Sequence, residues 1–324
     1  QYISLSQARA NSFKGLFSQN TVYKPVHPGV SIFKNQDLNA LLPYIDWTFF
    51  FHSWRLSGKY PQIFEDADKG EEARKLYDDA IRMLKMIVDK QLLTAHGIAG
   101  LFPANADGDD IIIYSDEKRE NEATRFSFLR NQQEKSGGLP NLCLSDFVAP
   151  KGMPDYLGLF VVTAGHGTEE LVKHYENSHD DYNAIMVKVL ADRLAEAFAE
   201  FLHEKVRREL WAYVPDEKLA TSQLLAEAYQ GIRPAPGYPA CPEHSEKQLL
   251  FDLLKAETHT SVTLTENFAM SPAAAVSGFY FAHPDAQYFN VGKISRDQIE
   301  DYSKRKKWTI AETERLLNAN LNYK

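Results

Sequence analysis

The sequence predicts an α+β fold in a single domain over residues 1–324, with helices packed on an antiparallel or mixed sheet. Segments with helical and strand periodicity do not alternate regularly, which argues against a βαβ architecture. The 324 residues contain no internal repeat and no low-complexity linker that would divide them. Hydrophobic residues make up 44% and charged residues 25% of the chain, a composition typical of a globular protein with a substantial core.

The helices are predicted from apolar residues at three- and four-residue spacing. They are expected over residues 4–13, 71–91, 181–213 and 217–230, and the third of these is the longest. Two further helices near the C-terminus are expected to begin at capping boxes, Ser295-x-x-Gln298 and Thr309-x-x-Glu312.

The strands are predicted from short runs rich in apolar and β-branched residues. They are expected over residues 96–102, 111–114 and 156–164. Residues 104–110 are rich in turn formers and separate the first two strands. Residues 115–140 are polar and contain a Ser-Gly-Gly turn, so they are interpreted as a connecting excursion.

Charge and cysteine content limit the possible functions. With 36 Lys and Arg against 44 Asp and Glu, the chain has a formal net charge of −8 and no long basic run, so we expect no binding to nucleic acid or to an anionic membrane surface. No apolar stretch approaches the ~20 residues that cross a bilayer, and no signal peptide is visible. Only two cysteines occur, Cys143 and Cys241, which favours a reducing, cytoplasmic location.

Two local patterns resemble a dinucleotide-binding motif and a metal site, but their residues favour neither interpretation. The stretch Thr163-Ala-Gly-His-Gly-Thr-Glu-Glu170 follows a strand, but Glu170 occupies the third glycine position of a dinucleotide fingerprint. Thr168 followed by acidic residues is better explained as a helix N-cap. A second group suggests a metal ligand set, but its two histidines are five residues apart and on different faces of a helix, so no metal site is expected. This group is His174, His179, Asp180 and Asp181.

The segment from Tyr44 to Trp54 is strongly aromatic and contains one acidic residue, Asp46. Aromatic runs usually belong to a core, and Phe49, Phe50 and Trp54 are expected to do so. A carboxylate beside Trp47 must either reach water or meet a cation. Aromatic faces next to a carboxylate suit a positively charged ligand such as an amine or a sulfonium.

The loop Gly231-Ile-Arg-Pro-Ala-Pro-Gly-Tyr-Pro239 is unusually rigid, because its prolines restrict φ and remove N–H donors. It presents Arg233, whose planar fork matches a carboxylate, next to Gly237, which permits a sharp turn. The alternative is a stiffened turn whose arginine pairs with a helix. A weaker candidate lies around Tyr288, which could close over an aromatic ligand or anchor a loop. Asp46, Arg233 and Tyr288 together would suit an amino-acid-like ligand that carries a nucleoside.

These segments, with several others, resemble one known family. The matching motifs are Asp46-Trp47, Arg55-x-x-Gly-Lys-Tyr-Pro61, Leu144-Ser-Asp-Phe147, Asp155-Tyr-Leu-Gly-Leu-Phe160, Ala191-Asp-Arg-Leu-Ala-Glu-Ala-Phe198, Gly231–Pro239, Ala275-Val-Ser-Gly278 and Tyr288-Phe289. On these motifs the sequence closely resembles the C-terminal S-adenosylmethionine-binding activation domain of cobalamin-dependent methionine synthase. The resemblance implies a C-shaped α+β domain with a twisted antiparallel sheet, which is not Rossmann-like.

The resemblance also implies the residues that bind S-adenosylmethionine. By position, Asp46 would hold the amino group of the ligand and Arg233 its carboxylate. The remaining contacts are implied for Ala235, Gly237 and Tyr238 in the loop and for Tyr288 and Phe289 at the adenosyl group. Glu196 on the long helix is carried over as well, with an ordinary helical pair with Arg193 as the alternative.

The function implied by the resemblance is reductive reactivation of methionine synthase, a 5-methyltetrahydrofolate–homocysteine methyltransferase of methionine biosynthesis. This domain would donate the methyl group of S-adenosylmethionine to oxidised cobalamin after one-electron reduction by a flavodoxin-type protein. It would need no acid or base of its own. Cobalamin would be carried by the cobalamin-binding domain of the same polypeptide, and zinc only by the homocysteine domain. The chain begins at Gln1 rather than Met, and we expect it to be a fragment of that larger enzyme.

Two alternatives remain open at the level of sequence. The first is a regulatory or docking domain that senses S-adenosylmethionine without delivering its methyl group. The second is a free-standing small-molecule methyltransferase, which would need an acceptor pocket and a general base of its own.

Overall fold

A computed structural model describes residues 1–323 and shows helices arranged around one antiparallel sheet. The sheet has the strand order β4-β3-β2-β5-β8, and β1 pairs with β2 beside this path. Its strands are β1 (Gly29–Phe33), β2 (Thr94–Asp107), β3 (Asp110–Tyr114), β4 (Glu122–Ser127), β5 (Asp155–His166) and β8 (Ala275–Tyr280). The predicted α+β class with an antiparallel sheet is confirmed.

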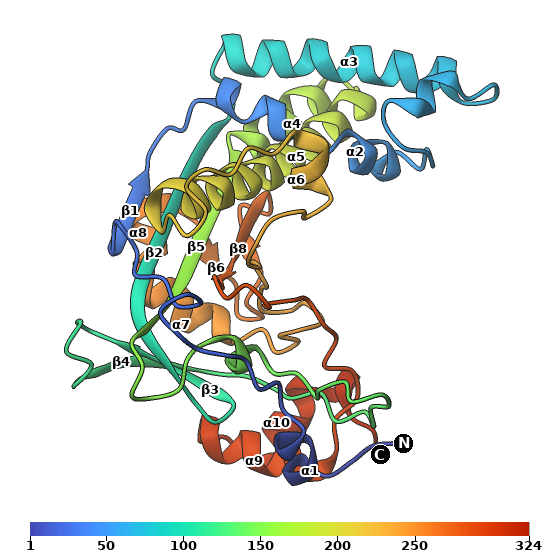
Figure 1. Cartoon of the computed structure of the whole chain (residues 1–324). Coiled ribbons are helices and arrows are strands. Elements are labelled where there is room, and N and C mark those ends of the chain that lie inside the picture. Colours follow the sequence, from blue (N-terminus) through green and yellow to red (C-terminus); the bar gives the residue numbers. More distant parts are fainter. Residues whose placement is uncertain (324) are drawn as a thin grey trace.

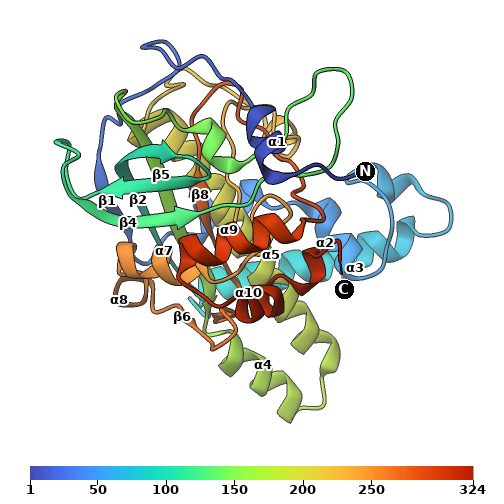
Figure 2. The ribbon, with the colours of Figure 1, turned by 90° about the horizontal axis from the view of Figure 1, so that it is seen from below.

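The helices gather at the two ends of the sheet, which gives the molecule the shape of a C (Figure 1). One end carries α2 (Trp47–Ser53), α3 (Gly70–Asp89), α4 (Thr168–Asn177) and α5 (Asp181–Lys205), with a π-helical turn at Val206–Leu210. The other end carries α1 (Leu5–Ala10), α9 (Arg296–Lys306) and α10 (Ile310–Leu316), and α9 lies beside α10 (Figure 2). The remaining elements are α6 (Thr221–Leu225), α7 (Glu246–Leu254), α8 (Ala256–Thr260), β6 (Thr263–Leu264), β7 (Met270–Ser271) and short 3₁₀ turns.

The long strand β2 explains the extended shape of the sheet. One edge of β2 pairs along most of its length with β5, as in the register Gly97↔Val162. The other edge is shared, because β1 pairs with residues 97–101 and β3 pairs with residues 104–107. The two ends of β2 therefore belong to different parts of the molecule and hold the arms of the C apart.

Each face of the sheet contributes alternate side chains to a different core. On one face Phe160 packs with Leu194 and Phe198 of α5, and on the other face Leu159 packs with Leu250 of α7. The helix α5 lies close to the strands because Gly97 of β2 has no side chain. A Cβ atom there would lie 2.7 Å from the ring of Phe198.

The predicted helix over 217–230 is wrong in extent, since only Thr221–Leu225 is α-helical. The chain before this helix is held by Glu217, whose carboxylate accepts Nε and Nη2 hydrogen bonds from the buried Arg207. After it, Glu227 adopts a left-handed conformation with φ of 54°, which ends the helix. Tertiary contacts thus override the local helical pattern.

The polar stretch 115–140 is not only a connection, because it contains β4. This strand reads as polar because Arg125 pairs with Glu122 and with Asp107 of β2 across the sheet. Residues 104–107, interpreted as part of a turn, instead extend β2. In both segments the polar side chains are accommodated in the sheet by ion pairs between strands.

Two of the predicted helix caps are also wrong. Ser295 precedes α9 but makes no side-chain cap, because the amide of Gln298 is used by the backbone N–H and C=O of Arg130. Thr168 is the first residue of α4, and Gly167 in a left-handed conformation occupies the N-cap position. At α10 the predicted cap forms, with the N–H of Glu312 donating to the Thr309 hydroxyl over 3.1 Å.

None of the helices among residues 1–323 combines the length and the apolar character needed to cross a membrane. Cys143 and Cys241 are both buried and not disulfide-bonded.

Candidate functional site

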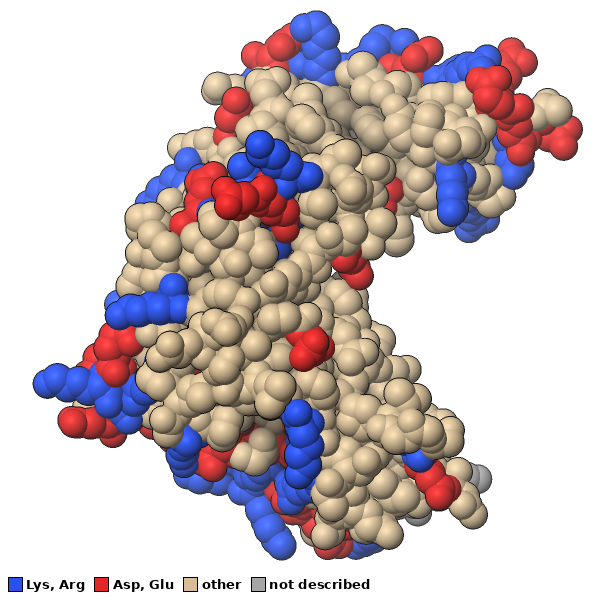
Figure 3. Space-filling model, in the orientation of Figure 1, with Lys and Arg blue, Asp and Glu red and all other residues tan. Residues whose placement is uncertain are grey.

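A cavity of about 680 Å³ lies on the concave side of the C, where α5, the segment before α2, the proline loop and β8 meet. The hollow of the C is lined mainly by uncharged side chains, with acidic ones beside it (Figure 3). The structure places seven of the eight predicted ligand-binding residues at this cavity: Asp46, Glu196, Arg233, Ala235, Tyr238, Tyr288 and Phe289. Residues nearly 250 positions apart in the chain therefore meet at one site.

Gly237, the eighth predicted residue, does not line the cavity. It has a φ of 93°, and its N–H donates to the carbonyl of Cys241 over 2.7 Å, so it forms the turn that carries Tyr238. A Cβ atom at this position would lie 2.3 Å from the ring of His244. A glycine is required here by the backbone, as the sequence indicated, and its contribution to the site is indirect.

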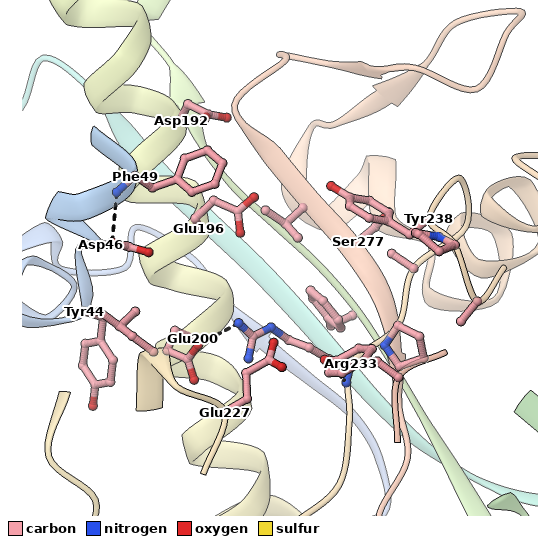
Figure 4. A pocket seen from close by; sticks show the side chains of 18 of the residues that line it. Tyr44, Asp46, Phe49, Asp192, Glu196, Glu200, Glu227, Arg233, Tyr238 and Ser277 are labelled. Atoms are coloured by element: carbon pink, nitrogen blue, oxygen red, sulfur yellow. Dashed lines mark hydrogen bonds and ion pairs between the residues drawn. The ribbon is translucent and has the colours of Figure 1, made fainter. Parts of the chain in front are cut away.

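Arg233 projects from the loop to the base of the cavity, where Glu200 and two tyrosines hold it (Figure 4). Its Nη2 donates to Glu200 Oε2 over 2.7 Å, and its Nη1 donates to the Tyr229 hydroxyl over 2.8 Å. Its backbone N–H donates to the hydroxyl of Tyr288 over 3.0 Å. Burial opposes the charge, but the adjacent Glu200 carboxylate outweighs it and raises the pKa of Arg233. The arginine is therefore a permanent cation.

Asp46 occupies the N-cap position of α2, where its Oδ1 accepts the backbone N–H of Phe49 over 3.1 Å. The capping bond explains why this acid stands in an aromatic run, because an N-cap satisfies an otherwise unpaired donor of the helix. Asp46 lines the cavity on the side of α2, and Tyr238 lies across from it (Figure 4). One carboxylate thus both caps a helix and faces the cavity.

The cavity carries more acidic than basic groups. Five carboxylates line it, against two arginines: Asp46, Asp192, Glu196, Glu200 and Glu227, with Arg193 and Arg233. Asp192 pairs with Arg193 over 2.6 Å, and Glu200 pairs with Arg233. Among residues 1–323 the other three carboxylates have no ion-pair partner, so the cavity is electronegative.

Glu196 does not form the helical pair with Arg193 that was the alternative explanation for it. Arg193 pairs instead with Asp192 and lies with its guanidinium carbon 4.5 Å from the ring centroid of Phe49. Burial of Glu196 raises the pKa of its carboxyl, and the nearby Arg193 and Arg233 oppose this effect only in part. Glu196 is therefore a half-buried acid that faces the cavity and has no ion-pair partner among residues 1–323.

Several lining residues were not identified from the sequence. They are Tyr44, Phe49, Asp192, Arg193, Glu200, Glu227 and Ser277. A signal existed for Glu200, which follows Glu196 by four residues and is followed by His203 and Arg207 on the same face of a largely apolar helix. Phe49 was assigned to the core, but it is 53% exposed and stands at the mouth of the cavity.

The two patterns that the sequence analysis set aside lie outside this cavity. In the glycine-containing stretch, the chain turns at Gly167 between β5 and α4, where a Cβ would lie 2.2 Å from the carbonyl oxygen of Leu92. Within the described part of the chain, no group of three or more His, Cys, Asp or Glu residues could hold a metal ion.

Comparison with known proteins identifies the family. The family model described as vitamin B12 dependent methionine synthase, activation domain, matches residues 37–307. The chain belongs to this family. It is also similar to a solved structure described as the crystal structure of the MetH reactivation domain bound to AdoHcy, with a TM-score of 0.96 and 50% identity. That match covers 100% of this chain and 99% of the other. The resemblance inferred from the motifs is confirmed, and with it the fold of an activation domain of methionine synthase.

Proposed function

We propose that this chain binds S-adenosylmethionine in the cavity and donates its methyl group to a cobalamin carried by the neighbouring domain of the same polypeptide. In this proposal residues 1–324 are the reactivation module of a larger cytoplasmic methionine synthase. A flavodoxin-type protein would supply the electron that returns oxidised cobalamin to its reactive state. The observation that carries the proposal is the charge arrangement of the cavity.

The charges of the ligand match those of the cavity. S-adenosylmethionine has a sulfonium, an ammonium and a carboxylate, so it carries a net positive charge. Asp46, Glu196 and Glu227 supply unpaired negative charge for the two cationic groups, and Arg233 supplies the positive charge for the carboxylate. The AdoHcy bound by the similar MetH domain has the same amino-acid and adenosyl parts.

The proposal assigns one part of the ligand to each group of residues at the cavity. Asp46 is the acid for the ammonium group, because its Oδ2 makes no hydrogen bond within residues 1–323. Arg233 binds the carboxylate. Tyr288 and Phe289 line the same cavity and would pack on the adenosyl group. Tyr238 is 61% exposed at the mouth of the cavity, where the methyl group would leave.

The chemistry requires the chain to bind and orient the donor rather than to move protons. Cobalamin, when held by the neighbouring domain, supplies the nucleophile for the methyl carbon. As the new bond to the methyl carbon forms, the C–S bond breaks and its electron pair stays on sulfur, which leaves a neutral thioether. No proton is transferred, so the cavity needs no general acid or base. Binding residues without a catalytic dyad fit this requirement.

The experiment that tests the proposal is isothermal titration of the chain with S-adenosylmethionine, beside Arg233→Ala and the matched control Arg296→Ala. Arg296 is 63% exposed and pairs with Glu300 on its own helix, so its removal changes the charge equally but far from the cavity. We expect saturable one-to-one binding that only Arg233→Ala weakens. Absence of binding by the folded chain would overturn the proposal.

A second measurement separates methyl donation from the regulatory alternative. The chain with bound donor is mixed with free cobalamin, with and without a one-electron reductant, and methylation of cobalt is followed by absorbance. We expect methylation only when the reductant is present. Tight binding without any methyl transfer would favour a domain that senses S-adenosylmethionine.

A further inference from the structure

A polar stripe runs along α5 through an otherwise apolar core. Glu196, Glu200, His203 and Arg207 follow one another at steps of three and four residues, so they share one face of the helix and its π-helical continuation. His203 and Arg207 are 0% exposed and Glu200 is 4% exposed. Buried polar groups on this scale need a reason, because each costs stability unless it is fully paired.

The stripe meets the cavity at the guanidinium of Arg233. Its Nη1 donates to Nδ1 of His203 over 3.0 Å and to the Tyr229 hydroxyl over 2.8 Å, and its Nη2 donates to Glu200. A guanidinium has five N–H groups, two of them on each Nη atom. Both Nη1 hydrogens are therefore used, and the Nε–H and one Nη2–H remain. Two N–H groups are the number that a carboxylate needs for bidentate binding.

The contact with Arg233 determines the protonation of His203. Arginine has no acceptor, so Nδ1 of His203 must accept the hydrogen bond and cannot carry a proton. The ring is consequently the neutral tautomer with its proton on Nε2. Burial and the two neighbouring cations Arg207 and Arg233 lower the pKa of His203 well below its usual value, which agrees with a neutral ring. Stacking on Tyr280, at 5.1 Å between centroids and 19° between planes, fixes the plane of the ring.

In this arrangement His203 has one N–H group without a hydrogen-bond partner among the described residues. This group, the Nε2–H, is buried. An unpaired buried donor destabilises a fold, so an apolar ring would fit this position at least as well as a histidine. Stability alone therefore gives no account of the histidine, whereas the acceptor that it presents to Arg233 does.

We propose that His203 is a positioning residue for ligand binding: its Nδ1 acceptor, with the Tyr229 hydroxyl, turns the guanidinium of Arg233 so that the Nε–H and one Nη2–H face the carboxylate of the ligand. This inference rests on the proposed function, because it assumes a carboxylate-bearing ligand in the cavity. His203 does not touch the ligand and acts through Arg233.

The test compares two substitutions with opposite effects on packing and on hydrogen bonding. His203→Phe keeps a ring that stacks on Tyr280 but has no acceptor. His203→Asn is smaller, but its Oδ1 can take the place of Nδ1. Tyr280→Phe is the matched control, since it removes a buried hydroxyl that has no hydrogen-bond partner in the described chain and keeps the stacked ring.

The probes are S-adenosylmethionine and decarboxylated S-adenosylmethionine, which lacks only the carboxylate. We expect His203→Phe to bind S-adenosylmethionine about tenfold more weakly, as on loss of one charge-assisted hydrogen bond, and to bind the decarboxylated probe like the wild type. His203→Asn should retain most of the affinity despite a lower melting temperature. Tyr280→Phe should bind both probes normally.

The proposal is overturned if His203→Phe binds S-adenosylmethionine as tightly as the wild type, or if it loses both probes equally. It is also overturned if affinity follows the melting temperatures, with His203→Asn the weakest binder, since that order indicates a role in packing alone. Failure of the wild type to bind either probe would count against the proposed function itself. If the wild type binds both probes with equal affinity, the carboxylate contributes nothing to binding. Arg233 then does not bind a carboxylate, and the proposed role of His203 is wrong.

Discussion

Two arginines, one buried near α9 and one half-buried at the cavity, differ in how many of their donors the protein uses. Arg130 lies near α9 and donates through Nε, Nη1 and Nη2 to Asp109, to Asp146 and to the carbonyl of Asn141, in five hydrogen bonds. Arg233 makes three side-chain hydrogen bonds, to His203, Tyr229 and Glu200. Arg130 is therefore saturated, whereas Arg233 retains two donors.

The two residues also differ in exposure and in the charge around them. The side chain of Arg130 is 3% exposed between two carboxylates, while that of Arg233 is 16% exposed with one. Arg130 and its two carboxylates, one of which also pairs with Arg9, form a closed network that only the fold requires. One carboxylate and two unused donors at the wall of a cavity leave room for an anionic group. Donor counting thus separates an arginine that holds the structure together from one that is available to a ligand.

The largest effect is expected on the free energy of unfolding when Arg130, whose donors are all used, is replaced. Arg130→Met leaves Asp109 and Asp146 buried without this partner and should lower the free energy of unfolding by about 3–5 kcal/mol. Urea denaturation measures this, with the exposed Arg296→Met as control. If Arg130→Met kept its stability and lost ligand affinity instead, the contrast between the two arginines would be wrong.

The next largest effect is expected on the affinity for S-adenosylmethionine when Arg233, which has two unused donors, is replaced. Arg233→Ala should weaken S-adenosylmethionine binding by about 2–3 kcal/mol, because a charge-assisted pair with the carboxylate is lost. Its loss of unfolding free energy should be smaller than that of Arg130→Met, since the side chain of Arg233 makes three hydrogen bonds and is 16% exposed, whereas that of Arg130 makes five and is 3% exposed. Calorimetric titration and urea denaturation of the same preparations give both values. An unchanged dissociation constant would remove Arg233 from the site.

A smaller effect is expected at the other end of the ligand, where Asp46 has two roles. Asp46→Asn should weaken binding by about 1 kcal/mol, because the charge facing the ammonium group is lost at a partly exposed position. It should leave stability unchanged, since asparagine caps helices as well as aspartate. Asp46→Ala should show the same loss of affinity and in addition lose about 1 kcal/mol of stability with the cap. Equal stability of the two variants would show that the cap is dispensable.

The smallest effect is a dependence of affinity on pH. Burial raises the pKa of Glu196, so this carboxyl takes up a proton at a higher pH than an ordinary glutamate does. Because only the ionised form attracts a cationic ligand, affinity should fall as the pH is lowered, and the fall should begin at a higher pH than the pKa of an ordinary glutamate would give. Glu196→Gln should bind more weakly and lose this part of the profile. A profile identical to that of the wild type would exclude Glu196 as its source.

Most of the fold could be predicted because its longer elements are locally consistent. Ala195, Phe198, Leu202 and Val206, which contribute to the apolar pattern of the long helix, are buried in the core, and the β-branched run of β5 is buried along its length. The errors occur where distant residues decide the local structure. Glu217 is held by Arg207, and the amide of Gln298 is taken by the backbone of Arg130. No local pattern contains these partners.

The candidate site, like the fold, was predicted from the sequence only in part. The sequence by itself determined which residues carry suitable chemistry, because an acid in an aromatic run and an arginine in a proline loop are unusual at any position. Only the tertiary structure decided that Asp46 and Arg233 line one cavity and that Glu200 and His203 of α5 hold the arginine. It also decided how many donors of Arg233 remain for a ligand. The physical reason is that burial and hydrogen bonding depend on contacts between residues far apart in the chain, which the order of residues does not specify.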